Sequence, residues 1–249
     1  MSLRVVNWNV EWATPKSRRT AEILNRIGRH GPEVACLTET HDGLLSQHGH
    51  TICSQPDYGY TVKEGRRKVM LWSKEPWHQV DDNGNDSMPP GRFVSGVTQT
   101  SVGEVTVIGI CIPWFGSRTE ANRTVERRVP WEDHEQYLGG LTEVFERADA
   151  RRLIVMGDFN QIVGPGSRAR PELRLALRKA FSPSMEIATS GLVFQGRKSI
   201  DHIALSPDWA VSSLSVISNI QDGRKLSDHF GVVADLSVQN SQCRPVPAR

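Results

Sequence analysis

Acidic and amide side chains directly follow an apolar segment in the second half of the sequence. Asp158 and Asn160 come after LIVMG (residues 153–157), a run typical of a buried strand. A turn would explain this pair equally well, because Asp and Asn side chains bond their own backbone and favour loops. However, similar residues stand within or beside four other strand-like segments: Asn9 and Glu11, Glu39, Asp201 and His202, and Asp228 and His229. Because loops at one end of the strands commonly converge in α/β proteins, we expect these segments to meet at one site.

The residue types in these segments indicate phosphoester hydrolysis with a divalent metal. Carboxylate and amide oxygens are hard ligands that suit Mg²⁺ or Mn²⁺, and Mg²⁺ commonly keeps waters beside a bound phosphate. A histidine beside a carboxylate stays charged and can donate a hydrogen bond to a phosphate oxygen. The sequence contains neither the GxxxxGK[ST] loop that cradles nucleotide phosphates nor the GxSxG turn of serine hydrolases. We therefore expect a site that activates water against a bound phosphate.

The elements that must position these residues follow from apolar periodicity and turn signals. A strand pair is predicted over residues 92–113, with its turn near Gly103, and a hairpin around Gly65 joins residues 58–65 to 67–73. The other predicted strands cover residues 4–12, 33–39, 152–157, 192–195, 199–206, 210–218 and 230–238. The predicted helices cover residues 16–29, 132–149 and 169–180. Because strands outnumber helices and the two neither alternate nor segregate, an α/β sandwich of mixed sheets with helices outside fits best.

The composition is that of an ordinary globular protein. The chain has 249 residues, of which 38% are hydrophobic and 23% charged, and these values exclude disordered and fibrous classes. No apolar stretch approaches the roughly 18 residues of a membrane span, and the first residues lack a secretory signal pattern. The four cysteines form no CxxC pair, and Cys36 and Cys111 stand in apolar segments typical of reduced, buried thiols. We expect a cytoplasmic protein and, by default, a monomer.

Five segments resemble the endonuclease/exonuclease/phosphatase superfamily, which includes deoxyribonuclease I and exonuclease III-like enzymes. They are NWNVEW (7–12), VACLTET (34–40), LIVMGDFNQ (153–161), SIDHIAL (199–205) and LSDHFGVVADL (226–236). They come in family order, and GDFN together with a terminal SDH is a specific combination. The resemblance implies an α/β fold in which two mixed β-sheets pack face to face with helices outside, a four-layered sandwich. It also implies a single catalytic domain over residues 1–240, followed by a flexible tail over 241–249.

The resemblance assigns four residues to the metal site. Asn9 and Glu39 are similar to the amide and the principal glutamate that bind the metal in this family. Asp228 matches an acid that contributes to the same site. Glu11 stands where some members have another acidic ligand, either direct or one step removed from the metal. The implied cofactor is Mg²⁺ or Mn²⁺.

The resemblance also assigns four catalytic residues. Asp158 is similar to the aspartate that orients or deprotonates the attacking water, and Asn160 to the amide that holds water or phosphate. His229 is similar to the histidine that contacts a non-bridging phosphate oxygen. Asp201 is similar to the acid that pairs with that histidine. His202 is expected to be structural.

The chain departs from the family pattern in the segment ICIPWFGSR (110–118). Many members have a tyrosine or a histidine where this chain has Cys111, and a thiol is a poor donor to phosphate. This departure weakens assignment to the abasic-site endonucleases and leaves the metal site intact. His134 or an arginine is a candidate for the missing donor.

Several arginines lie between two tryptophans over residues 114–131, a segment expected to start near the site. Trp114, Arg118 and Arg123 would suit contacts to the phosphates and bases of a nucleic acid. A solvated helix face is the alternative, because glutamates stand between the arginines. A weaker basic candidate is EGRRK (64–68), which we place at a hairpin tip.

These patterns predict a Mg²⁺- or Mn²⁺-dependent phosphoester hydrolase, most consistent with a phosphodiesterase or nuclease. The expected partner is a phosphodiester substrate, for which nucleic acid fits. Two alternatives remain open: hydrolysis of small phosphoesters or phospholipid head groups on the same fold, and a binding module that has lost catalysis.

Overall fold

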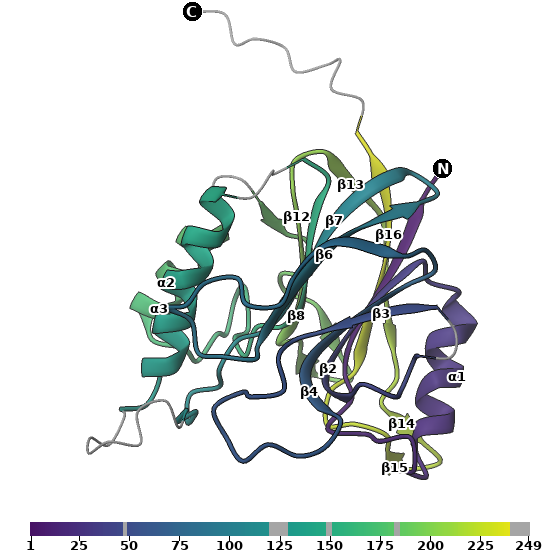
Figure 1. Cartoon of the computed structure of the whole chain (residues 1–249), viewed down its shortest axis with the longest axis horizontal. Coiled ribbons are helices and arrows are strands. Elements are labelled where there is room, and N and C mark those ends of the chain that lie inside the picture. The colour runs from purple at the N-terminus through teal and green to yellow at the C-terminus, as the bar shows by residue number, and fades with distance from the viewer. Residues whose placement is uncertain (47–48, 120–128, 148–150, 182–184, 240–249) are drawn as a thin grey trace, which may run out of the picture.

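The computed structural model describes residues 1–46, 49–119, 129–147, 151–181 and 185–239, and its helices and strands form four layers (Figure 1). One six-stranded sheet has the order β13-β16-β1-β2-β4-β3, and its strands are β1 (Leu3–Asn9), β2 (Val34–His41), β3 (His50–Cys53), β4 (Arg66–Ser73), β13 (Trp209–Ile217) and β16 (Gly231–Val238). The other has the order β5-β6-β7-β8-β12-β9, and its strands are β5 (Trp77–Asp81), β6 (Phe93–Thr100), β7 (Gly103–Cys111), β8 (Leu153–Asp158), β9 (Glu186–Ile187) and β12 (Asp201–Leu205). Two small hairpins complete the strands: β10 (Val193–Phe194) with β11 (Arg197–Lys198), and β14 (Ile220–Gln221) with β15 (Arg224–Lys225).

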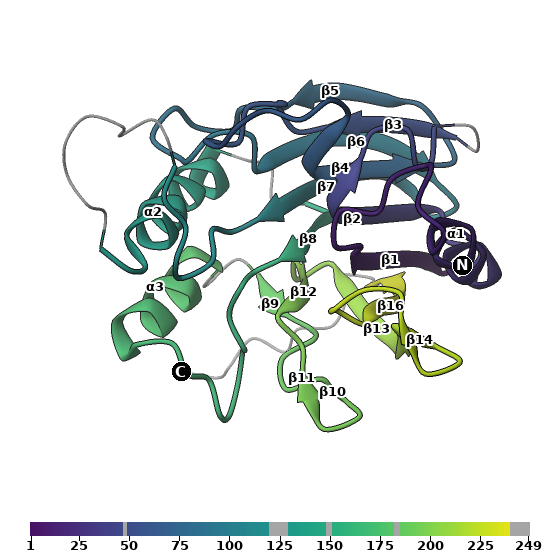
Figure 2. The ribbon, with the colours of Figure 1, turned by 90° about the horizontal axis from the view of Figure 1, so that it is seen from below.

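Both large sheets are mixed, which confirms the predicted fold class. In the first sheet β1 runs parallel to β2 and antiparallel to β16. In the second sheet β7 runs parallel to β8, whereas β8 is antiparallel to β12. Figure 2 shows α1 (Thr20–His30) outside the first sheet, and α2 (Glu132–Arg147) and α3 (Pro171–Phe181) beside the second.

Alternating side chains of β1 show how the sequence creates these layers. Val5 faces the second sheet and joins the central core cluster, whereas Val6 and Trp8 face α1. All three are fully buried, and each buried apolar side chain of this size contributes about 1.5–3 kcal/mol to folding. On the outer face of the second sheet, a third cluster joins Tyr137 of α2 to Phe181 of α3.

Asn7 connects the two sheets through hydrogen bonds inside the sandwich. Its side-chain Nδ2 donates to the backbone oxygens of Gly157, at 3.0 Å, and of His202, at 3.1 Å. These oxygens belong to β8 and β12 of the second sheet, while Asn7 lies in β1 of the first. The bonds therefore fix β1 against the strands that carry the acidic segments.

The structure corrects the hairpin predicted around Gly65. Residues 58–65 form no strand; β4 pairs instead with β2 and with β3, a strand that the sequence did not predict. The polar segment HTIC of β3 lacks the apolar alternation on which strand prediction depends. β5 was missed for the same reason. The predicted tail over 241–249 lies outside the described residues, and among those described no helix is long and apolar enough to span a membrane.

Candidate active site

Asp158 lies at the end of β8, deep between its neighbouring strands. The register pairs it with Cys111 of β7 and with Asp201 of β12. Gly157 allows this close approach, because its φ is 148° and an added Cβ would lie 1.8 Å from the Ile110 oxygen. Position 157 therefore has no room for a side chain. This close packing holds the next residue, Asp158, whose carboxylate is 3% exposed, in one position.

Both oxygens of Asp158 accept hydrogen bonds. Asn9 Nδ2 donates to Oδ2 at 3.1 Å, and the backbone N–H of Asn160 donates to Oδ1 at 2.8 Å. Asn160 has a left-handed backbone, with φ 51°, and its Nδ2 donates to the Ile112 oxygen at 2.8 Å. The turn after β8 thus holds the amide and the carboxylate in one rigid unit, as the GDFN segment suggested.

His229 and Asp201 form an ion pair beside Asp158. His229 Nδ1 lies 2.6 Å from Asp201 Oδ2, although the two residues come from different sheets. Ser227 secures the histidine, because its hydroxyl donates to the Asn9 oxygen at 2.7 Å and accepts from the His229 N–H at 3.1 Å. The imidazole is therefore oriented with Nε2 available for another partner.

The electrostatics of the pair differ from those of Asp158. Burial alone would lower the pKa of His229, but the charges of Asp201, Asp158 and Asp228 raise it to about 10. Burial, followed by repulsion from Asp201, raises the pKa of Asp158 to about 7, against the opposing effect of His229. Near neutral pH the site therefore contains a protonated imidazole next to a carboxylate that accepts protons readily.

Glu39 lies near the end of β2 in an ion pair with Lys68 of β4. The Lys68 ammonium is 2.7 Å from Glu39 Oε1 and also lies over the ring of Trp12, 4.8 Å from its centroid. Glu39 is close enough to Asp158 to contribute to the raised pKa of that residue. The two sheets thus supply carboxylates to the same end of the sandwich.

Glu11 and Asp228 occupy the edge of this cluster. Glu11 Oε2 forms a 2.8 Å ion pair with Arg19 and accepts the backbone N–H of Asp228 at 3.2 Å. Asp228 Oδ1 lies 3.7 Å from His229 Nε2. Glu11 therefore holds the loop that carries Asp228 and His229.

A divalent cation fits the donors at this end of the molecule. Among the described residues, Asp201 Oδ1 is buried and accepts no hydrogen bond, and an uncompensated carboxylate oxygen is costly to bury. Asp228 Oδ1 also accepts no hydrogen bond, although it faces His229 Nε2. Ligand atoms of Asp158, Asp201 and His229 lie within 4.8 Å of one another. His229 Nδ1 is already bonded to Asp201, so the carboxylates, with Glu39, are the hard donors that could hold such an ion.

The structure corrects the candidate role of His134 in substrate binding. Its ring is completely buried, with Nδ1 bonded to the Pro113 oxygen at 2.6 Å and Nε2 to the Gln161 side chain at 2.7 Å. Burial lowers its pKa to about 4. His202 is structural, as expected, because its ring bonds Thr189 and the Gln161 oxygen. Neither histidine replaces the donor that is missing at Cys111.

The segment after β7 carries exposed aromatic residues. Trp114 is 49% exposed and Phe115 51%, and their rings meet edge to face at 4.8 Å. The backbone of Arg118 is tied to the Tyr60 hydroxyl at 2.7 Å, and its side chain is exposed. Arg123 lies outside the described residues. The segment after β7, the strand that lies beside Asp158, therefore exposes aromatic rings and at least one cationic side chain.

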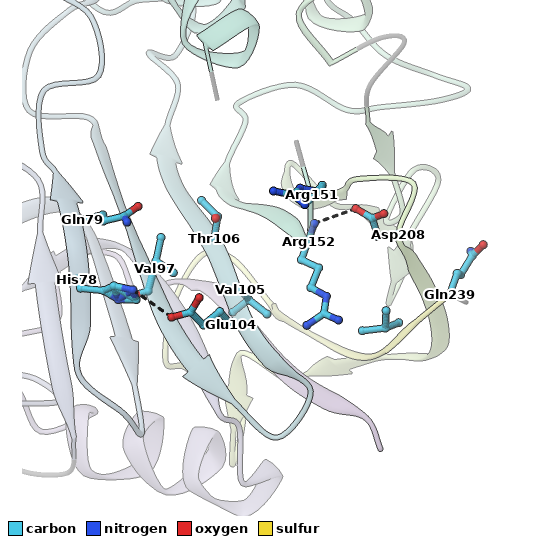
Figure 3. A pocket seen from close by; sticks show the side chains of 11 residues that line it. His78, Gln79, Val97, Glu104, Val105, Thr106, Arg151, Arg152, Asp208 and Gln239 are labelled. Carbon is cyan, nitrogen blue, oxygen red and sulfur yellow. Dashed lines mark hydrogen bonds and ion pairs between the residues drawn. The ribbon is translucent and has the colours of Figure 1, made fainter. Parts of the chain in front are cut away.

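A hollow of about 610 Å³ at the opposite end of the sandwich has a different character (Figure 3). Its lining includes Thr106 and Arg152, near the starts of β7 and β8, so it lies a strand's length from Asp158. Its acids already have partners: Glu104 lies 3.4 Å from His78, and Asp208 accepts the Arg152 backbone N–H at 2.8 Å. The acidic cluster, rather than this hollow, is the candidate active site.

A comparison with known protein families identifies the family of the chain. The model of the Endonuclease/Exonuclease/phosphatase family matches residues 6–229. The chain belongs to the endonuclease/exonuclease/phosphatase family. Enzymes of this family hydrolyse phosphoesters and generally depend on a divalent metal. No curated protein sequence matches the chain.

Solved structures of the endonuclease/exonuclease/phosphatase fold match nearly the whole chain at low identity. The endonuclease domain of TRAS1, a telomere-specific non-LTR retrotransposon, is 19% identical with a TM-score of 0.64, covering 96% of this chain and 100% of that one. The 3′ phosphatase NExo from Neisseria, bound to a product DNA hairpin, is 18% identical with a TM-score of 0.66 and coverages of 94% and 99%. D. rerio TDP2, complexed with a single-strand DNA product, is 12% identical with a TM-score of 0.66 and coverages of 95% and 99%. At these identities the likeness shows the fold alone.

Two contributors to the site escaped sequence analysis. Lys68 belongs to the run EGRRK, which looked like an exposed hairpin tip, and no sequence signal marked it as buried. Ser227 stands directly before Asp228, and its place in the motif LSDH was the available signal. Its bonds to Asn9 and His229 depend on the pairing of the first strand with the last.

Proposed function

We propose that this protein is a divalent-metal-dependent phosphodiesterase that acts on nucleic acid. The observation that carries the proposal is the arrangement of Asp158 beside the His229–Asp201 pair. A carboxylate that takes up a proton near neutral pH, 2.8–3.1 Å from fixed amide donors, lies next to an oriented imidazolium. This combination suits general-base activation of water with electrostatic stabilisation of a phosphate.

Each residue has a role that follows from its contacts. Asp158 accepts the proton of the attacking water, and its bonds to Asn9 and Asn160 hold the carboxylate at the required angle. His229 donates from Nε2 to a non-bridging phosphate oxygen, because Nδ1 is already committed to Asp201. Asp201 keeps the imidazole protonated, so the charge that develops on the phosphate meets a fixed positive group.

Glu39, Asp228 and Asp201 are the carboxylates that would hold the cation. Hard oxygens of this kind favour Mg²⁺ or Mn²⁺, and the bound ion would supply positive charge to the phosphate. Asn9 supports the same region through Asp158. Glu11 contributes through its bonds to Arg19 and to the Asp228 backbone.

Nucleic acid is supported as the substrate by the exposed surface after β7. Trp114 and Phe115 expose about half of their area, and aromatic faces stack on unpaired bases whatever their sequence. The exposed Arg118 suits a phosphate of the same strand. Related structures with bound DNA, those of NExo and TDP2, agree with this choice.

Turnover of several phosphoesters with and without metal tests the proposal. We expect hydrolysis of bis-p-nitrophenyl phosphate and of labelled DNA in Mg²⁺ or Mn²⁺, and its loss in EDTA. Glu39→Gln should lower kcat/KM by roughly 10²-fold at low Mg²⁺, because a charged hard ligand is removed. Asp222→Asn is the matched control, since Asp222 is exposed, with φ 48°, and asparagine tolerates that backbone.

The other outcomes decide between the alternatives. Turnover restricted to small monoesters or phospholipid head groups would replace nucleic acid as the substrate. No turnover of any phosphoester, by a folded protein with either metal, would identify a binding module. Full activity in EDTA would contradict the metal dependence.

A further inference from the structure

Lys68 is a buried lysine in a strand whose following residues are apolar. It is 8% exposed, and Val69, Met70 and Leu71 after it are fully buried. Burying an ammonium costs free energy unless the charge is paired and its donors are used. The sequence therefore places a charge where packing alone would favour an apolar side chain.

The contacts of Lys68 satisfy its charge only in part. The ammonium has three donors, and among the described residues it donates one hydrogen bond, to Glu39 Oε1 at 2.7 Å. Two aromatic rings provide further contacts: the Trp12 centroid lies at 4.8 Å and the Tyr58 centroid at 5.7 Å. Aromatic faces attract a cation but accept no conventional hydrogen bond. The Lys68 ammonium therefore has N–H groups left to donate beside the Glu39 carboxylate.

The register of β2 and β4 places Glu39 opposite Lys68, at a point where the backbone of β2 is locally distorted. Thr38 pairs with Val69 and Thr40 with Arg67, but the residues between them leave the regular ladder. Glu39 has φ 46°, a left-handed conformation that is unfavourable for glutamate, and its carbonyl accepts the Trp12 N–H. Strained backbone of this kind persists only where its surroundings hold it, and it is commonly found at ligand sites.

We propose that Lys68 is a phosphate-binding residue that shares the Glu39 carboxylate with the divalent cation. The inference rests on the proposed function and extends it to a residue outside the family motifs. The ammonium donates a spare N–H to a non-bridging oxygen of the phosphoester. Lys68 and His229 then contact the phosphate from opposite parts of the first sheet, β4 and the loop before β16.

The shared carboxylate gives the proposal a distinctive signature. Two cations on one carboxylate repel each other, so Lys68 weakens binding of the metal alone. An anionic phosphate attracts both cations, so Lys68 strengthens binding of phosphate. A lysine that merely held Glu39 in place would instead support the metal, and removing it would weaken metal binding.

Lys68→Met tests these opposite effects with binding measurements. Mn²⁺ binding is measured by calorimetry without substrate, and inorganic phosphate is titrated both with Mg²⁺ and in EDTA. We expect Lys68→Met to bind Mn²⁺ at least about threefold more tightly and phosphate at least about tenfold more weakly. Lys68→Arg, which keeps the charge, should stay near wild type for phosphate, and Lys74→Met is the control because Lys74 is exposed near the other end of the strand pair.

Each outcome decides whether Lys68 binds phosphate, once thermal melts show that the variants are folded. Unchanged phosphate binding in Lys68→Met, or weaker binding of both ligands, overturns the role of Lys68. If Lys68→Met does not fold, loss of phosphate binding in Lys68→Gln with retention in Lys68→Arg supports the role, and equal binding by the two overturns it. Equal Mn²⁺ binding by wild type and Glu39→Gln would contradict the proposed metal site, while the titration in EDTA still reports on Lys68.

Discussion

The two ends of the sandwich differ in how completely their carboxylate oxygens are bonded. At the end opposite the active site, Arg4 makes two bonds to Asp235, at 2.7 and 3.0 Å, and Glu33 accepts two from Ser101, each at 2.7 Å. At the active-site end, Asp201 Oδ1 and Asp228 Oδ1 accept no bond within the described part of the chain.

Backbone strain does not distinguish the two ends. Left-handed backbones occur at both: Glu11, Trp12, Glu39 and Asn160 at the active-site end, and Gln79 and Arg152 beside the hollow at the opposite end. Such conformations cost of order 1–3 kcal/mol each and persist where neighbouring contacts hold them. The two ends therefore differ in how completely their carboxylate oxygens are bonded. Mutations at the two ends should separate activity from stability.

Asp158→Asn should give the largest effect on activity. The amide cannot accept a proton from water, so kcat should fall by roughly 10²-fold or more. Stability should change little, because removing the buried carboxylate that repels Asp201 offsets the loss of one of its two accepted hydrogen bonds. Steady-state kinetics and urea unfolding measure the two effects. A variant that lost both activity and stability would contradict the division between the ends.

The Asp201–His229 pair should show strong non-additivity in kcat. Each alanine variant should lose roughly 10²-fold, because each destroys the same oriented imidazolium. The double variant should therefore be little worse than either single variant. Kinetics of the four proteins in a double-mutant cycle measure this coupling. A double variant that showed the full product of the two single losses would mean that the residues act independently.

His134 predicts a loss of stability in acid. Its pKa is 6.5 in an unfolded chain and about 4 in the folded one, so between these values the unfolded state binds the extra proton. The contribution of the neutral His134 to the free energy of unfolding is fully present above pH 6.5. It is lost as the pH falls toward 4, and the complete loss is about 3 kcal/mol. Urea unfolding at pH 7 and pH 4.5 should show a smaller decline in the free energy of unfolding for His134→Gln than for wild type. Parallel declines would exclude His134 as the source.

Glu33→Ala should give the smallest effect, and on stability alone. Its carboxylate connects the segment before β2 to Ser101 in the turn between β6 and β7. Loss of this connection between sheets should cost about 1–2 kcal/mol, measured by urea unfolding. Turnover per folded molecule should stay at the wild-type value, because the active site is a strand's length away. Reduced kcat in a fully folded variant would show that the ends are coupled.

Sequence patterns identified the strands that end in acidic and amide residues more readily than the contacts between the sheets. LIVMGDFN marked β8 because an apolar run and a turn-forming pair are both local signals, and that strand is confirmed. The approach of Asp201 to His229 came from the family resemblance, since it depends on pairing between distant strands.

Lys68 and His134 show why the remainder could not be predicted. The printed contacts of Lys68 are to Glu39, Trp12 and Tyr58, which come from segments distant from β4 in the sequence, so no local pattern marked its burial. His134 looked like an available donor because its helix starts near the site. Its partners, Pro113 and Gln161, come from two other segments, and only the packed structure shows that both ring nitrogens are taken.

The position of β16 has a consequence for biosynthesis. This strand is the last of the described chain, yet it lies inside its sheet between β13 and β1. His229 stands in the loop just before it, two residues ahead of Gly231. While the ribosome still holds these residues, β1 has an open edge and Asp201 has no imidazole partner. Because synthesis runs from the N-terminus, the His229–Asp201 pair can form only after these last described residues have left the ribosome.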